Sequence, residues 1–195
     1  MTITKVLVPS GVLGLGFDIE ALKHGIKNKP DIISIDGGST DSGPASLGSG
    51  TSKYSRAAIK SEGKTLMQAR KEANVPLIIG TCGTCGTNSM VDWMEEITIE
   101  LAEELGQSLK IAKLYCEQNI DFLKNKLKIN RIFPLEPAPT LNVHLLDDLS
   151  HVVALAGAEQ VIEAINTGAD IILAGRTTDT AIISALPLMN GVDPG

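Results

Sequence analysis

The side chains that could bind or transform a ligand are concentrated in four short segments rich in glycine, serine, threonine and aspartate. In the last segment, Arg176 precedes Asp179 by three positions. A guanidinium can hold a carboxylate or a phosphate through two hydrogen bonds, and an aspartate beside it can orient that group or act as a base. Asp36, which begins the second segment, adds a carboxylate suited to acid–base work or to binding Mg²⁺, a sugar hydroxyl or a phosphate. We predict that Asp36, Arg176 and Asp179 are catalytic, with a structural Arg–Asp pair as the alternative.

The glycines of the four segments predict close approach between the backbone and a ligand. Glycine tolerates a positive φ and lets backbone N–H groups reach an anion, and a following helix adds the positive end of its dipole. The first segment, residues 10–16, has neither the G-x-G-x-x-G spacing nor the Lys-Ser/Thr of a P-loop, so a tight turn without a ligand is the alternative there. A mobile surface loop is the alternative for the second segment. The predicted ligand-binding residues are Gly11, Gly14, Gly16, Gly37, Gly38, Ser39, Thr40, Thr81, Gly83, Thr84, Gly86, Asn88, Gly175, Arg176 and Thr177.

The cysteines and histidines predict no metal site. Cys82 and Cys85 form a C-x-x-C in the third segment, and Cys116 is the one other cysteine. A zinc or iron–sulfur site needs more ligands than these. The three histidines show no metal-binding spacing with one another, although His151 could reach a site through folding. We therefore predict no metal and leave the cofactor unknown; a catalytic thiol stays open, without a histidine near it in the sequence.

The composition excludes several classes of protein. The 195 residues carry 17 Lys and Arg against 23 Asp and Glu, a formal charge of −6, and only 3% of them are aromatic. Without a basic stripe or aromatic platforms, nucleic acid is not an expected partner. No apolar run is long enough to span a membrane, and the N-terminus leads into a strand rather than resembling a signal peptide. Since three cysteines are too few for a secreted disulfide framework, we expect a cytoplasmic protein.

Alternating strand and helix patterns predict the scaffold that carries the four segments. Apolar runs of strand length recur, and between them apolar residues repeat at the three- and four-residue steps of a helix. This alternation is typical of an α/β fold, and we predict a Rossmann-like open, mostly parallel sheet with helices on both faces. The expected strands are 5–9, 31–36, 75–80, 109–115 and 170–175, and the expected helices are 17–27, 55–73, 89–105, 120–127 and 158–167.

Each of the four segments follows a predicted strand. In an open parallel sheet, ligands bind outside the carboxyl ends of the strands, where loops and helix N-termini converge. The alternating pattern of residues 109–115 favours a strand near a sheet edge or one with a single covered face. Residues 37–51 are expected to form a long loop, and the prolines within residues 130–150 exclude a long helix there. The four segments should therefore meet at one edge of the sheet.

Residues 157–182, GAEQVIEAINTGADIILAGRTTDTAI, form the most distinctive stretch of the chain. They resemble a segment of the acyclic terpene utilisation protein A family, and the order of the glycine-rich segments is similar too. The resemblance implies that Gly175, Arg176 and Asp179 match family positions, but it brings no catalytic role with them. Proteins of the family are generally longer. We therefore expect residues 1–195 to form a single α/β domain that is the N-terminal part of a longer or two-part protein.

These observations together predict a small-molecule catabolic enzyme domain. It would bind an anionic substrate, a carboxylate or an acyl-CoA, in the glycine-rich loops, and lyase or hydratase chemistry is the expected reaction class. The alternative is a non-catalytic ligand-binding or assembly subunit, whose loops pack on a second half, a partner subunit or another copy of the chain in a homo-oligomer. A third hypothesis is a protein that binds nucleotide phosphates with Mg²⁺.

Overall fold

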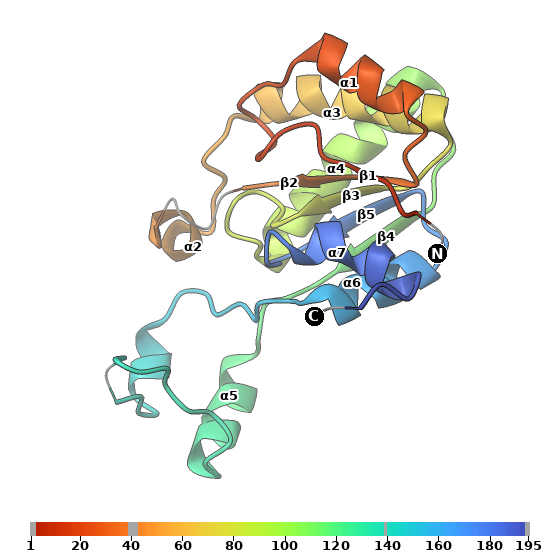
Figure 1. Cartoon of the computed structure of the whole chain (residues 1–195). Helices are drawn as coiled ribbons and strands as arrows, with labels where there is room; N and C mark the ends of the chain where they lie inside the picture. Colours follow the sequence, from red (N-terminus) through yellow and green to blue (C-terminus); the bar gives the residue numbers. More distant parts are fainter. Residues whose placement is uncertain (1–2, 39–42, 139, 194–195) are drawn as a thin grey trace.

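A parallel β-sheet lies at the centre of the computed structural model, which describes residues 3–38, 43–138 and 140–193 (Figure 1). The strands are β1 (Val6–Leu7), β2 (Ile32–Asp36), β3 (Leu77–Gly80), β4 (Ile111–Leu114) and β5 (Ile171–Ala174). Their order across the sheet is β1-β2-β3-β5-β4, and every neighbouring pair is parallel. The predicted parallel sheet is confirmed, and β4 lies at its edge, as the alternating pattern indicated.

Helices cover both faces of the sheet, as predicted. Helices α1 (Ile19–Lys27), α3 (Arg56–Ala73) and α4 (Asn88–Leu105) lie on one face, and α6 (Ala158–Asn166) and α7 (Ala181–Met189) lie on the other (Figure 1). Side chains that alternate along a strand point to opposite faces, so Ile33 and Ile35 of β2 join the first apolar core, whereas Ile32 joins the second. In the described part of the chain, no helix is long and apolar enough to cross a membrane.

Capping residues set the ends of the main helices. The Asp18 carboxylate accepts hydrogen bonds from the N–H groups of Glu20 and Ala21, which begins α1. Helices α3 and α4 stop at Asn74 and Gly106, which adopt left-handed φ values of +55° and +57°. Asparagine and glycine take this conformation at the lowest cost. The sequence patterns therefore placed these boundaries within a residue or two.

The expected long loop between β2 and α3 contains a short helix. This helix, α2 (Ala45–Ser49), follows Pro44 and ends at Gly50, whose φ is +65°. None of its residues is buried, so the segment carries no apolar stripe from which a helix could be predicted. In the described residues 130–138 and 140–150, the chain is irregular, as the prolines indicated, except for one turn of 3₁₀ helix, η2 (Leu145–Asp148).

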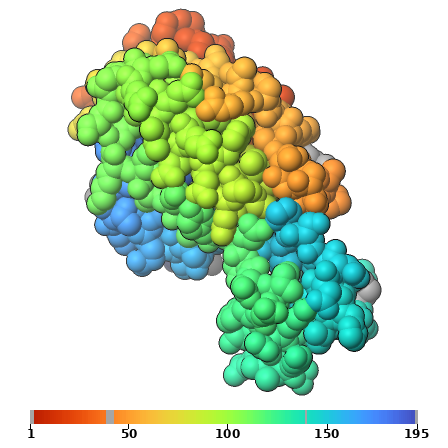
Figure 2. Space-filling model, turned by 180° about the vertical axis from the view of Figure 1, so that it is seen from behind, coloured from red at the N-terminus to blue at the C-terminus, as the bar shows by residue number. Residues whose placement is uncertain are grey.

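Residues 118–138 and 140–150, here called the lobe, project from the body at the carboxyl side of the sheet (Figure 1), and Figure 2 shows them from behind as a separate knob. The lobe holds α5 (Ile120–Lys128) and η2, which the Lys124–Asp147 ion pair joins. No side chain of α5 is buried. The large apolar side chains exposed on the lobe are Phe122, Ile129, Phe133, Leu135, Leu145 and Leu149.

The neighbouring strands β3 and β5 send their chains to opposite faces of the sheet. From β3 the chain continues into α4 on one face, and from β5 it continues into α7 on the other. Where two adjacent parallel strands diverge in this way, a crevice opens outside their carboxyl ends, and ligands of α/β proteins bind there. The topology therefore directs attention to the loops after β3 and β5.

Candidate functional site

Asp36 ends β2 and is buried, with 7% of its surface exposed. The pKa of Asp36 is raised to about 7, chiefly because burial removes its carboxylate from water. A hydrogen bond from the Gly38 N–H (3.3 Å) opposes this rise, and the negative charge of Asp179 adds to it. The Thr81 hydroxyl and the Arg176 guanidinium lower the pKa by smaller amounts. A carboxyl group that titrates near neutrality can both donate and accept a proton, as general acid–base catalysis requires.

Arg176 and Asp179 follow β5, and the structure brings both within electrostatic range of Asp36. Nη1 of Arg176 donates to the carbonyl of Thr84 at 3.0 Å. Among the residues that the structure describes, this is the one hydrogen bond of the guanidinium, so its other donors can serve a ligand. Asp179 is exposed in the turn before α7. The three residues predicted as catalytic thus lie together, although their roles stay a prediction.

The loop between β3 and α4, residues 81–87, is buried throughout and lies between the other two loops. Four of its residues have a left-handed φ: Thr81, Gly83, Thr84 and Gly86. For residues other than glycine this conformation costs roughly 1–2 kcal/mol, so contacts must hold the two threonines in it. The Thr81 hydroxyl lies 3.3 Å from the Thr177 hydroxyl, and the Thr84 hydroxyl accepts the N–H of Lys53 at 3.2 Å.

The glycines of the three central loops allow these loops to pack against one another. A Cβ atom at Gly38 would lie 2.1 Å from Cα of Thr84, and one at Gly86 would lie 2.5 Å from the nitrogen of Arg176. No side chain fits at such separations. At Gly37 and Gly175 as well, a Cβ atom would lie less than 3.0 Å from a backbone atom of another segment. The predicted ligand residues Ser39 and Thr40 lie outside the described residues.

The first glycine-rich segment behaves differently. The N–H groups of Gly14 and Gly16 donate to the two carboxylate oxygens of Glu62, on α3, at 2.7 Å each. Gly11 is exposed, and nothing lies within 4 Å of the place where its Cβ would be. The sequence predicted that the N–H groups of this segment would bind the anion of a ligand. In the structure, the carboxylate of Glu62 occupies that role for two of them.

Most backbone donors of the loop after β3 are paired as well. The N–H groups of Cys82, Thr84, Cys85 and Gly86 donate to carbonyls within the chain, and that of Asn88 donates to Glu117. A ligand that used these N–H groups would have to displace an existing acceptor. The predicted backbone cradle therefore stays a prediction, and side chains are the better candidates for holding a ligand.

The cysteines lie in the interior rather than in a reactive position. Cys82, Cys85 and Cys116 are all buried and unbridged. Burial raises the pKa of the Cys82 and Cys116 thiols, which disfavours the reactive thiolate. Within the described ranges, no group of three or more His, Cys, Asp or Glu side chains is placed to hold a metal ion.

Two residues that are not among the predicted site residues lie at the same edge. Glu117 follows β4 directly after Cys116, and one of its carboxylate oxygens lies 2.6 Å from Nδ1 of His151. A signal for Glu117 was present, because this carboxylate comes two residues after the predicted strand 109–115, near the same end at which Asp36 closes the predicted strand 31–36. His151, which the sequence analysis noted only as a histidine that could reach a site through folding, comes 34 residues later and does reach this edge.

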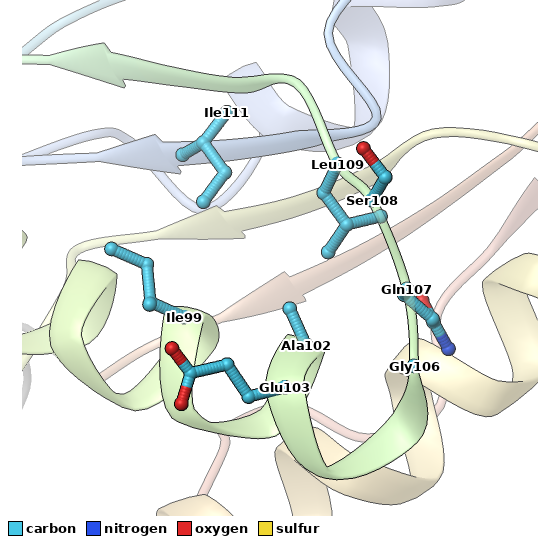
Figure 3. A pocket seen from close by; sticks show the side chains of 8 residues that line it. All are labelled: Ile99, Ala102, Glu103, Gly106, Gln107, Ser108, Leu109 and Ile111. Carbon is cyan, nitrogen blue, oxygen red and sulfur yellow. The ribbon is translucent and has the colours of Figure 1, made fainter.

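A groove of about 520 Å³ lies at the opposite edge of the sheet, between the end of α4 and the start of β4 (Figure 3). Ile99, Leu109 and Ile111 give it an apolar lining, and Glu103 borders it. None of the predicted site residues lies there. The chemistry-bearing side chains are therefore gathered at the carboxyl edge, not in this groove.

One comparison with known proteins finds a family. A family model described as acyclic terpene utilisation family protein AtuA matches residues 39–190, which is most of the chain. The matched range includes the loop after β3, Arg176 and Asp179, and it excludes Asp36 and the first glycine-rich segment. Searches of curated proteins and of solved structures gave no match.

Proposed function

The chain belongs to the acyclic terpene utilisation family AtuA, and on that premise we propose that it is part of a catabolic enzyme that binds a small anionic substrate. The substrate is a carboxylate or an acyl-CoA, and it binds at the carboxyl edge of the sheet. The family's name supports a role in the breakdown of acyclic terpenes, and the acids and thioesters formed in such a breakdown carry the anionic groups that this site suits.

One observation carries the proposal: a buried carboxyl group with a pKa of about 7, Asp36, lies beside Arg176 and Asp179. The free donors of Arg176 would hold the anionic group of the substrate. Asp36 would exchange a proton with it, and Asp179 would orient Arg176 or act as a second base. Addition or removal of water, or cleavage beside a carbonyl, needs this combination of a cation and an acid–base group. Lyase or hydratase chemistry is the reaction class that we propose.

The test is a ligand screen followed by thermal unfolding. The probes are acetate, coenzyme A, acetyl-CoA, inorganic phosphate and ATP, each with and without Mg²⁺. A ligand at 100 times its Kd stabilises the folded state by about 2.7 kcal/mol, so binding appears as a rise in Tm. We expect acetate or acetyl-CoA to raise the Tm of the wild-type protein and ATP not to raise it.

Two substitutions of Arg176 and one control substitution decide whether Arg176 holds the probe. Arg176→Ala should abolish the rise in Tm, Arg176→Lys should retain part of it, and Arg131→Ala, an exposed arginine of the lobe, should retain all of it. An equal rise in Arg176→Ala would refute the role of this residue. A rise with ATP that depends on Mg²⁺ would favour the nucleotide-binding hypothesis instead.

The lobe favours a second candidate, a non-catalytic binding or assembly subunit. Its exposed apolar side chains are typical of a surface that a partner covers, and Phe133 and Leu135 are 73% and 87% exposed. The partner would be a second half of the protein, another subunit or another copy of this chain. Light scattering of the wild type and of a Phe133→Ser, Leu135→Ser double variant tests self-association: a dimer that the variant converts to a monomer would support it.

A further inference from the structure

A histidine–glutamate pair at the carboxyl edge of the sheet has no part in the proposed function so far. Nδ1 of His151 lies 2.6 Å from Oε1 of Glu117. The second oxygen, Oε2, accepts the N–H of Asn88, the first residue of α4, at 3.0 Å. In return, Oδ1 of Asn88 accepts the N–H of Glu117 at 3.2 Å. The carboxylate of Glu117 is thus fixed at both of its oxygens.

This arrangement determines which ring nitrogen of His151 is free. A carboxylate only accepts hydrogen bonds, so the proton of a neutral imidazole must lie on Nδ1, and Nε2 then carries the lone pair. Nε2 faces Gly50, where a Cβ atom would lie 2.5 Å from it. Within the described ranges Nε2 has no hydrogen-bond partner, and about a quarter of the side chain is exposed, at 26%. An imidazole that is held in a fixed orientation and whose lone pair has no partner can serve as a general base.

The pair and Arg176 border the same loop. Asn88, which holds Glu117, directly follows residues 81–87. Thr84, in the middle of that loop, accepts the hydrogen bond from the Arg176 guanidinium. The anion-binding group and the imidazole are therefore positioned by one short stretch of backbone.

The segment after α2 contacts both His151 and the loop after β3. Gly50 faces Nε2 of His151, and three residues later the N–H of Lys53 donates to the hydroxyl of Thr84. The strand ends agree with this placement, because the Cβ position of Gly175 lies 3.0 Å from the Cβ of Cys116, the residue before Glu117. The ends of β4 and β5 thus bring Glu117 and Arg176 to neighbouring positions of one edge.

We infer, on the basis of the proposed function, that His151 is a catalytic base for the bound acid or thioester and that Glu117 is its positioning residue. In the step that we assign to it, the lone pair of Nε2 takes a proton from the carbon next to the substrate carbonyl. The electron pair of that C–H bond moves into the carbonyl and forms an enolate. The imidazolium returns the proton to the same carbon or to a leaving hydroxyl, so the step needs no other reactant.

A structural role for the same pair must be separated from this one. The pair lies where the lobe joins the body, beside hydrogen bonds from Gln118 N to Val152 O and from Ala154 N to Cys116 O, both 2.8 Å. A pair that only stabilised this junction would affect the stability of the lobe and would leave proton transfer unchanged. The experiment therefore has to measure proton transfer itself.

Exchange of the methyl protons of acetyl-CoA for deuterium in D₂O measures that step directly, by mass spectrometry. We expect the wild-type protein to catalyse the exchange and His151→Gln to slow it by about 100-fold or more, the contribution of a general base. Glu117→Gln should slow it as well, because the amide no longer selects the productive tautomer. His144→Gln, which changes an exposed histidine of the lobe, should exchange at the wild-type rate.

The outcomes separate this inference from the proposed function. If acetyl-CoA raises the Tm but the protein does not exchange it, or if His151→Gln exchanges it as fast as the wild type, the inference is wrong and the proposed function stands. If none of the acid or thioester probes raises the Tm, the proposed function fails first. As an independent check, ¹⁵N NMR of labelled histidine should show that the neutral ring of His151 carries its proton on Nδ1; a neutral ring with the proton on Nε2 would overturn the inference.

Discussion

Two glycine-rich loops that look alike in the sequence are used differently in the structure. In the loop after β1, residues 10–16, Gly11, Leu15 and Gly16 are exposed, and Glu62 accepts hydrogen bonds from two of the loop's N–H groups. The loop after β3, residues 81–87, is buried and packs its backbone against that of Arg176. The difference lies in their neighbours, because β1 is an edge strand, whereas β3 lies between β2 and β5. A run of glycines shows that the backbone can turn sharply or approach another segment closely. Whether such a loop contributes to a site depends on the position of its strand in the sheet.

The largest expected effect comes from adding one methyl group to the loop after β3. Gly86→Ala places a Cβ 2.5 Å from the nitrogen of Arg176, at a φ of +66°. Overpacking and backbone strain together should lower the free energy of unfolding by about 3–5 kcal/mol. Urea unfolding followed by circular dichroism measures it. A loss below about 1 kcal/mol would show that this loop is as tolerant as the loop after β1, and the contrast would fail.

The second effect concerns the charge state of Asp36 beside the same loop. The pKa of Asp36 rises from 3.8 to about 7 on folding, so between these values the folded state holds a proton that the unfolded state has lost. The free energy of unfolding should therefore fall as pH rises through this window, by about 2–3 kcal/mol between pH 5 and pH 8. Asp36→Asn should remove this part of the pH dependence, and Asp148→Asn, on the lobe, should not. Equal slopes in the wild type and Asp36→Asn would contradict the raised pKa.

Much of the fold could be predicted from the sequence, because strand length, helix periodicity and capping residues are local properties. The apolar run at Ile32–Asp36 and the helix periodicity of residues 55–73 are examples. The meeting of Asp36 with Arg176 could be anticipated from one general rule, that parallel strands end at one edge. The strand order could not be predicted, because it depends on which face of the sheet each connecting helix crosses.

The rest of the site could not be predicted, because it depends on contacts between segments far apart in the chain. Glu62 lies 48 residues from Gly14, to which it bonds, and His151 lies 34 residues from Glu117. No periodicity or spacing connects such pairs. The sequence also does not show what occupies the space beside a glycine. That space can hold a ligand, another loop or only solvent.

The third effect tests whether Glu62 serves as the anion of the loop after β1. Glu62→Gln keeps the shape of the side chain but leaves one accepting oxygen for the N–H groups of Gly14 and Gly16. The free energy of unfolding should fall by about 1–2 kcal/mol, the value of a charged hydrogen bond that is partly retained. Glu72→Gln, on the exposed end of the same helix, should change it by less than about 0.5 kcal/mol. Equal effects would mean that this loop does not depend on Glu62.

The smallest effect separates backbone conformation from packing within the loop after β1. Gly16 has a φ of +86° but nothing within 4 Å of its Cβ position, so Gly16→Ala should cost only the conformational term, about 1 kcal/mol. Gly11 has open space and no left-handed φ, so Gly11→Ala should change the free energy of unfolding by less than about 0.5 kcal/mol. Because neither substitution meets a neighbouring atom, the expected order is Gly86→Ala, then Gly16→Ala, then Gly11→Ala. If Gly16→Ala cost as much as Gly86→Ala, strain alone would explain both, and packing against Arg176 would no longer be what distinguishes the loop after β3.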